Sequence, residues 1–218
     1  MSNWFHRRLD GSIHGVMSFM GGFLGTYAIQ SRGGIFASAQ TGNLMAMAEN
    51  VRAGQWMEFL LRAGTLPLFA MGIVGAHLLL KKPDVPVRKM SLILDGLALA
   101  VTSVLPGTLP GLAAVYPIFV AAGFQWVAFT NVEGYSSATV FSSNNFRQSV
   151  TGYVDYLLTG NPKDLEKSAV YGRAVVTFLA GAFYGCVAVA QWGYKGGLAG
   201  FLPLALAYGL VRATEKGA

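Results

Sequence analysis

Long apolar stretches alternate with short polar segments along the whole chain. Six stretches come close to the twenty or so residues that a helix needs to cross a bilayer, namely residues 12–31, 57–80, 90–106, 111–132, 168–192 and 197–213. Two further segments, 36–50 and 137–158, are moderately apolar, and each starts with a half rich in Gly, Ser, Thr and Asn. The pattern predicts an all-α polytopic membrane helix bundle, with six spanning helices and two broken or re-entrant helices.

Composition supports a bilayer environment and excludes several kinds of chemistry. The chain is 53% hydrophobic and 12% charged, with a mean hydropathy of +0.47, which is typical of membrane proteins. Its one cysteine, Cys186, permits neither an intrachain disulfide nor a cysteine metal cluster. No phosphate-binding loop or nucleophile elbow is present. We therefore expect no enzyme activity, cofactor or metal, although Asp95 with Glu133 is a candidate acid pair for an intramembrane enzyme.

Positive charge discriminates between re-entry and spanning for the two polar segments. If both re-enter, the basic residues on the cytoplasmic side are Arg7, Arg8, Lys81, Lys82, Arg88, Lys89, Lys163, Lys167, Arg212 and Lys216. Only Arg32, Arg52 and Lys195 then lie outside. If both span, the basic loop 81–89 moves outside and the bias almost vanishes. We predict re-entry with cytoplasmic termini, and because topology accounts for the net charge of +6, we expect no nucleic-acid partner.

Re-entry has a consequence for the symmetry of the chain. It divides the sequence into two repeats, 1–107 and 108–218, each with three spans. Because three is odd, the second repeat inserts upside down relative to the first. The repeats should be inverted, and their re-entrant segments should approach the midplane from opposite faces.

Several short runs carry a resemblance to a known family. They are Gly21-Gly22-Phe23-Leu24, Arg32-Gly33-Gly34-Ile35-Phe36-Ala37, Ala39-Gln40-Thr41-Gly42-Asn43, and the looser Gly134-Tyr135, Ala138-Thr139 and Asn145-Phe146-Arg147. They resemble the YoaK family of bacterial inner-membrane proteins, a domain of unknown function called DUF1275, over nearly the whole chain. The resemblance implies a multi-pass protein of the bacterial inner (cytoplasmic) membrane with no established substrate. The chain departs from the family pattern at Gly25, where many members have an acidic residue.

Two stretches that we call signatures, residues 21–43 and 123–145, are candidate binding sites, because each runs from an apolar span through glycine into a short segment rich in Ser, Thr and Asn. A helix that begins at Thr41 or Asn43 exposes unpaired N–H groups, which favour anions or polar neutral molecules. The predicted solute contacts are Thr41, Gly42, Asn43, Ser143, Asn144 and Asn145, and the residues expected to set polarity and charge are Gln40, Gln125, Arg62, Arg147 and Arg173. The alternative is that these residues only satisfy backbone groups where the helices break.

Charged residues inside the predicted spans form a second group of candidates. Arg62 and Arg173 each lie near the start of the span after a re-entrant segment, so we expect them to be equivalent positions in the two repeats. Asp95, Glu133 and Asp155 are their candidate counter-ions, and Asp95 or Glu133 is a candidate for proton coupling. The alternative for both arginines is that they extend to the membrane surface.

Together these features predict a secondary transporter or channel-like permease for a small anionic or polar solute. Its partners would be the lipid bilayer and that solute. The alternative is a non-transporting membrane scaffold or sensor. Glycines at four-residue spacing, such as Gly21 with Gly25 and Gly181 with Gly185, predict close helix contacts within a protomer or between the protomers of a homo-oligomer.

Overall fold

A computed structural model describes residues 2–32, 34–37 and 40–216, and this part of the chain is nearly all helix. The helices are α1 (Ser2–Ser31), α2 (Gln40–Arg52), α3 (Trp56–Leu80), α4 (Val87–Val104), α5 (Gly111–Ala114), α6 (Tyr116–Ala128), α7 (Ser143–Thr159), α8 (Pro162–Trp192), the 3₁₀ helix η1 (Gly193–Gly200) and α9 (Phe201–Lys216). Strands β1 (Asn131–Val132) and β2 (Tyr135–Ser136) form a small antiparallel hairpin. The predicted all-α class is confirmed.

One predicted span, residues 111–132, is not a single helix. It is divided into α5 and α6 at Val115, because Pro117 has no N–H to continue the helix across the junction. Its last residues belong to the β1–β2 hairpin instead. Both turn residues of that hairpin, Glu133 (φ 53°) and Gly134 (φ 90°), have positive φ, as the tightest hairpin turns require.

Each of the two polar segments begins with a short extended stretch and continues as a longer helix. Residues 34–37 precede α2 without regular structure, and residues 137–142 precede α7 in the same way. The helix then returns beside the next long helix, since α2 packs on α3 and α7 packs on α8. The polar runs at residues 40–43 and 143–145 therefore mark where each helix starts, and the described non-helical residues precede them.

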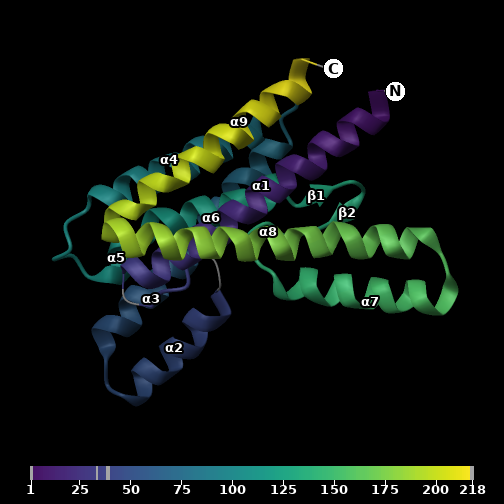
Figure 1. Ribbon diagram of the computed structural model, residues 1–218. Coiled ribbons are helices and arrows are strands. Elements are labelled where there is room, and N and C mark those ends of the chain that lie inside the picture. The colour runs from purple at the N-terminus through teal and green to yellow at the C-terminus, as the bar shows by residue number, and fades with distance from the viewer. Residues whose placement is uncertain (1, 33, 38–39, 217–218) are drawn as a thin grey trace.

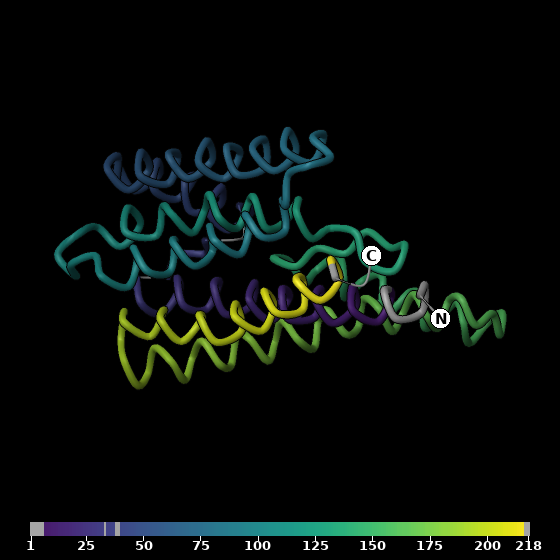
Figure 2. Tube along the Cα trace, turned by 90° about the horizontal axis from the view of Figure 1, so that it is seen from above, coloured from purple at the N-terminus to yellow at the C-terminus, as the bar shows by residue number. Residues whose placement is uncertain are grey.

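The long helices form a layered bundle with its outermost members on opposite sides. Figure 2 shows α3 and α8 on the two sides, with α1, α4, α6 and α9 between them. In space, α1 packs against α8 and α9, while α6 packs against α3 and α4. The start of α1 and the end of α9 lie at the same end of the bundle, and α2 and α7 project from its lower side (Figure 1).

Two glycines permit the crossing of α1 and α8. A methyl group on Gly22 would collide with the Phe178 carbonyl, and one on Gly181 would collide with the Phe19 carbonyl. The two backbones therefore touch directly. Because Gly11 lies by Arg173 and Gly185 lies by Phe23, α1 and α8 run parallel.

The crossing of α3 and α6 is built in the same way. A methyl group on Gly72 would collide with the Val120 carbonyl, and one on Gly123 would collide with the Phe69 carbonyl. In all four helices the glycine lies three residues after the carbonyl that its own helix presents. Close backbone approach of this kind is how small residues pack helices in lipid.

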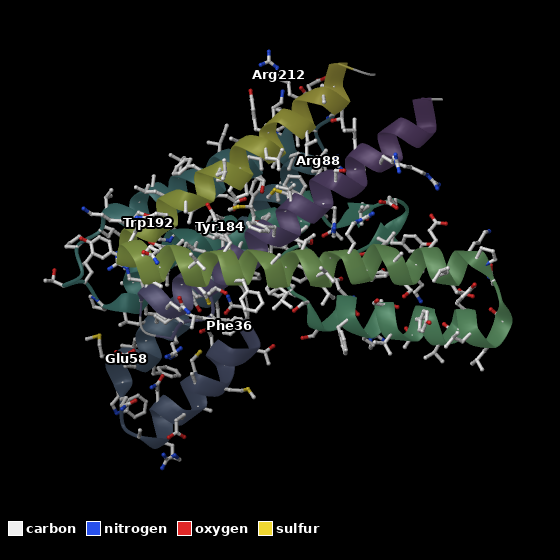
Figure 3. The ribbon with its side chains drawn as sticks, in the orientation of Figure 1. Phe36, Glu58, Arg88, Tyr184, Trp192 and Arg212 are labelled. Atoms are coloured by element: carbon white, nitrogen blue, oxygen red, sulfur yellow. The ribbon has the colours of Figure 1, made fainter. Side chains whose placement is uncertain are left out.

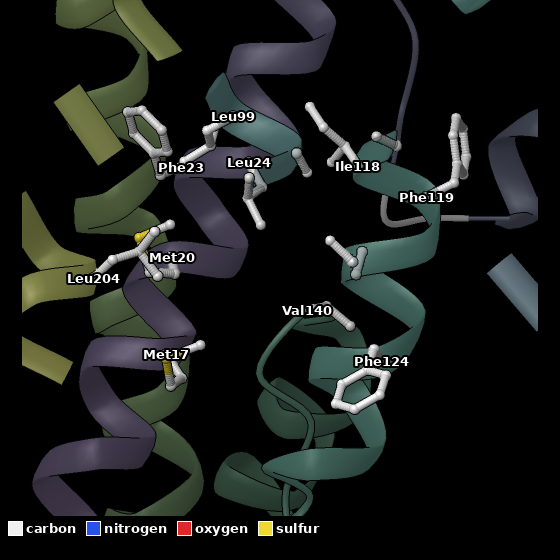
Figure 4. Packing of buried hydrophobic residues seen from close by; sticks show 14 of the residues in the cluster. Met17, Met20, Phe23, Leu24, Leu99, Ile118, Phe119, Phe124, Val140 and Leu204 are labelled. Carbon is white, nitrogen blue, oxygen red and sulfur yellow. The ribbon is translucent and has the colours of Figure 1, made fainter. Parts of the chain in front are cut away.

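Buried apolar side chains fill the space between the two crossings. Figure 4 shows those of α1 facing α6, with further side chains from α4, α9 and residues 137–142; the labelled members are Met17, Met20, Phe23, Leu24, Leu99, Ile118, Phe119, Phe124, Val140 and Leu204. Each is at most 5% exposed. The core therefore lies on the line between α1 and α6.

The outermost helices face outward with apolar side chains. In the described part of the chain, the two helical stretches long and apolar enough to cross a membrane are Trp56–Leu80 and Pro162–Glu215, the latter taking in α8, η1 and α9. Only 22% of the most apolar window is buried in each. An apolar helix with this little burial is typical of a lipid-facing position, which supports a membrane protein; the six predicted spans stay a prediction.

The α1–α8 crossing can be tested with a single methyl group. We expect Gly181→Ala to lower stability by about 1–3 kcal/mol, because the new carbon collides with backbone that cannot rotate away. The matched control is Gly209→Ala in α9, where an added carbon meets nothing within 4 Å. Thermal unfolding of the detergent-solubilised protein measures both, and equal unfolding temperatures for the two variants would contradict the crossing.

Candidate functional site

The segment 137–142 enters the bundle against the backbone of α1. Thr139 and Ser137 are fully buried, and a methyl group on Gly21 would collide with the Thr139 carbonyl. His14 Nε2 donates to the Ser137 carbonyl at 2.9 Å. The glycine of the first signature thus makes room for the extended segment of the second.

Two asparagines hold the extended segments at matching places. Asn43 donates from Nδ2 to the Phe36 carbonyl at 3.1 Å, and Asn145 donates from Nδ2 to the Ala138 carbonyl at 2.6 Å. Each carbonyl belongs to the residue seven positions before the asparagine. Both asparagines are 1% exposed, so each side chain substitutes for a backbone partner where the helix is absent.

Asn145 uses its whole side chain in this way. Besides Ala138, its Nδ2 donates to the Phe141 carbonyl at 3.2 Å. Its Oδ1 accepts from the Ala138 N–H at 3.3 Å and the Ser137 hydroxyl at 3.2 Å. Of the two readings that the sequence left open, these bonds favour satisfaction of the broken backbone for this residue.

Asn43 differs, because its oxygen faces a cation. Arg62 donates from Nη1 to Asn43 Oδ1 at 3.4 Å and from Nε to Asn50 Oδ1 at 3.2 Å. Within the described residues no ion pair neutralises Arg62. Its positive charge is therefore held by the oxygens of two neutral amides.

Arg62 lines a hollow of about 410 Å³ together with Arg32 and Glu58. Arg32 donates from Nη2 to the carbonyls of Thr102 and Leu105, both at 2.8 Å. It thereby satisfies carbonyls at the carboxyl end of α4, where cations are favoured. Sequence reasoning placed Arg32 in the signature but not among the candidates for solute binding.

Other signature residues lie at the surface. Thr41, Gly42, Ser143 and Asn144 are exposed, and the exposed Arg147 donates to Asn144 Oδ1 at 2.9 Å. The structure therefore brings only part of each predicted signature into the bundle.

The starts of α2 and α7 nevertheless approach the same part of α3. Gln40 Oε1 accepts from the Thr65 hydroxyl at 3.4 Å. One turn further along α3, the Phe69 ring lies 6.4 Å from the Phe141 ring, measured between centroids. Trp126 also contacts Phe141, with 4.7 Å between ring centroids. Both broken segments thus converge on the middle of α3, and Trp126 fills space there.

One known family matches nearly the whole chain. The model of the family described as "Protein of unknown function (DUF1275)" matches residues 13–211, from α1 to α9. The chain belongs to the DUF1275 family. No curated protein and no solved structure matches it.

In this DUF1275 protein, Gln125 links three parts of the site. Its Nε2 donates to the Met17 carbonyl at 2.9 Å and to the Thr139 hydroxyl at 3.0 Å. It therefore joins α6 to α1 and to the segment 137–142. Its Oε1 is buried without a hydrogen-bond partner in the described part of the chain.

Asp95 is a fully buried acid in the DUF1275 bundle. Asp95 and Ser91, one turn apart on α4, are both 0% exposed. Neither oxygen of the carboxyl group, nor the Ser91 hydroxyl, has a hydrogen-bond partner among the described residues. A bare carboxylate buried in this way costs several kcal/mol, so the group needs a proton or a cation.

Arg173 has the counter-ion that the sequence predicted. It forms an ion pair with Glu133, and the pair lies directly on Gly11 of α1. Asp95, in contrast, forms no ion pair with Arg62 or Arg173 in the described part of the chain, so its expected role as their counter-ion is wrong.

Arg62 and Arg173 do not lie at matching distances from the glycines of the two crossings. Arg62 lies ten residues before the crossing glycine Gly72, whereas Arg173 lies eight residues before Gly181. Tyr171 is the residue ten positions before Gly181. The sequence could not align α3 with α8 residue by residue, because it did not show which glycines make the crossings.

The role of Asn145 can be separated from that of its neighbour. We expect Asn145→Ala to release the segment 137–142 and to lower stability by about 1–3 kcal/mol, because buried carbonyls lose their partner. Hydrogen exchange of backbone amides in that segment should rise. The exposed Asn144→Ala is the control, and equal exchange in the two variants would show that Asn145 does not hold the segment.

Proposed function

We propose that this protein is a secondary transporter or channel-like permease for a small anionic or polar solute. The observation that carries the proposal is the pair of extended segments, 34–37 and 137–142. An asparagine seven residues downstream binds a carbonyl of each segment and so holds it against the bundle. Irregular backbone at membrane depth is tolerated where protein buries it or where it lines a water-filled path. Transporters use such breaks to bind polar solutes near the midplane.

We further propose that the two halves are inverted repeats. The glycine crossings support this, because α1 meets α8 as α6 meets α3. The equivalent helices α1 and α6 run in opposite directions, since Arg32 lies by Gly111 while Met17 bonds to Gln125. A two-fold axis in the membrane plane relates helices in this way.

Composition supports re-entry of α2 and α7. Each begins with polar residues, Gln40, Thr41 and Asn43 in α2 and Ser143, Asn144 and Asn145 in α7, and polar side chains are unfavourable inside a bilayer. With α2 and α7 re-entrant, α1, α3, α4, α5 with α6, α8 and α9 supply six spans.

The distribution of charge supports cytoplasmic termini in a bacterial inner membrane. Figure 3 shows Arg88 and Arg212 at the end of the bundle where the termini lie, with Glu58 and Trp192 towards the other end. Ion pairs of Arg88 with Asp10 and of Lys89 with Glu215 join α4 to α1 and α9 at the terminal end. An excess of Lys and Arg marks the cytoplasmic side.

Arg62 is the residue that we assign to solute attraction. It lines the hollow at the end away from the termini, and its partners Asn43 and Asn50 are neutral. An anion that enters this hollow meets Arg62 beside the first broken segment. Guanidinium groups bind carboxylates and phosphates in a fixed two-pronged geometry.

Flux through liposomes tests the transport proposal. We expect uptake of small anions or polar solutes under a proton or sodium gradient, and at least a tenfold lower anion flux in Arg62→Gln. The control is Arg52→Gln, because Arg52 is exposed and already paired with Glu49. Absence of flux for a panel of anions, nucleobases and polyols would contradict transport and favour the scaffold or sensor.

Asp95 is the candidate for proton coupling. We expect Asp95→Asn, which keeps the volume but cannot exchange a proton, to abolish proton-driven accumulation while leaving solute exchange at equal concentrations within about twofold of the original. Both rates are measured in the same liposomes. If proton-driven accumulation of solute persists in Asp95→Asn, another residue, for instance Glu133, couples transport to protons.

A further inference from the structure

A charged hollow lies where the first turns of α1 meet α8. It has a volume of about 620 Å³, and its charged lining consists of Arg7, Arg8, Glu133, Glu166 and Arg173. These residues come from α1, from the β1–β2 turn and from α8. The hollow therefore lies at the terminal end of the bundle, which the charge distribution makes cytoplasmic.

An apolar groove continues from this hollow. The groove has a volume of about 660 Å³ and shares Gly11, Ser12 and Arg173 with the hollow. Its deeper walls are apolar or aromatic: Val16 and Phe19 of α1, Tyr184 of α8, and Leu202 and Leu206 of α9. The two spaces together have a charged head and an apolar tail.

The groove has the length of one lipid leaflet. Arg173 and Tyr184 are eleven residues apart on α8, which corresponds to about 16 Å at the helical rise. Half of the hydrocarbon core is about 15 Å. Because α1 and α8 run parallel, both walls pass from charged to apolar in the same direction.

The charges at the head favour an anion. Three arginines face two glutamates, so the formal charge of the lining is +1. The Arg7–Glu166 pair is loose, with 3.8 Å between Nη1 and Oε1 and with both side chains well exposed. Arginine forks suit phosphate oxygens, and basic pockets between membrane helices on the cytoplasmic side bind anionic headgroups.

We propose that this hollow and groove form a binding site for one anionic phospholipid of the cytoplasmic leaflet. The phosphate of its headgroup contacts Arg7, Arg8 and Arg173, and one acyl chain lies between α1, α8 and α9. The proposal rests on the membrane placement given under the proposed function, and it is independent of any solute flux.

Lipid retention by the purified protein tests the head of the site. Native mass spectrometry would count bound phosphatidylglycerol against phosphatidylcholine with the same acyl chains. We expect at least fivefold more phosphatidylglycerol retained, and loss of that preference in the double variant Arg7→Gln/Arg8→Gln. The exposed Arg212→Gln, which removes a charge outside the groove, is the control. Equal retention of the two lipids, or an unchanged preference in the double variant, would overturn the proposal.

A variant that fills the groove tests the tail. The side chain of Gly15→Phe would project into the groove, since a carbon added at Gly15 meets only the Thr177 methyl group at 3.7 Å. We expect at least a fivefold loss of phosphatidylglycerol with every arginine in place. Soluble glycerol phosphate should compete at least a hundredfold more weakly than the lipid; equal competition would indicate a free phosphate site instead. No solute gradient is involved, so failure here leaves the flux result unaffected.

Discussion

Direct contact between helix backbones at four glycines is the constraint on which the rest of the structure depends. Side chains gain no hydrophobic free energy by leaving lipid for protein, so membrane helices associate through close packing and interhelical hydrogen bonds. Gly22, Gly72, Gly123 and Gly181 allow two such contacts, α1 with α8 and α3 with α6. Each contact joins a helix of the first half to one of the second, so neither half packs as a separate unit.

Buried polar side chains are needed where the two extended segments enter this packing. The extended segments leave N–H and C=O groups without helical partners, and in lipid each such group would cost several kcal/mol. Asn43, Asn145 and His14 meet part of that demand, because each donates to a carbonyl of an extended segment. Asp95 is left with no partner among the described residues. The same bundle thus combines side chains that satisfy non-helical backbone with a buried acid, Asp95, that needs a proton or a cation.

Hydrophobic pattern predicted the helices and the positions of the breaks, because both depend on local composition. The polar runs at residues 40–43 and 143–145 coincide with the first turns of α2 and α7, and the described non-helical residues come before them. Four-residue glycine spacing identified one side of one crossing, because Gly181 and Gly185 both lie against α1, but it did not identify Gly22, Gly72 or Gly123. For the same reason it did not show that Arg62 and Arg173 differ in their spacing from the crossing glycines. His14 bonded to Ser137 joins residues 123 positions apart, and no local pattern records such a contact.

The central claim, two inverted repeats with re-entrant α2 and α7, is tested most directly by the side of the membrane that two loops face. Single cysteines at Asp84 and Asp164, in a Cys186→Ser background, would be labelled from each side of the membrane with an impermeant reagent. Inverted repeats predict cytoplasmic labelling at both positions. Labelling of position 84 from outside and of position 164 from inside would mean that both short helices span, and would contradict the account.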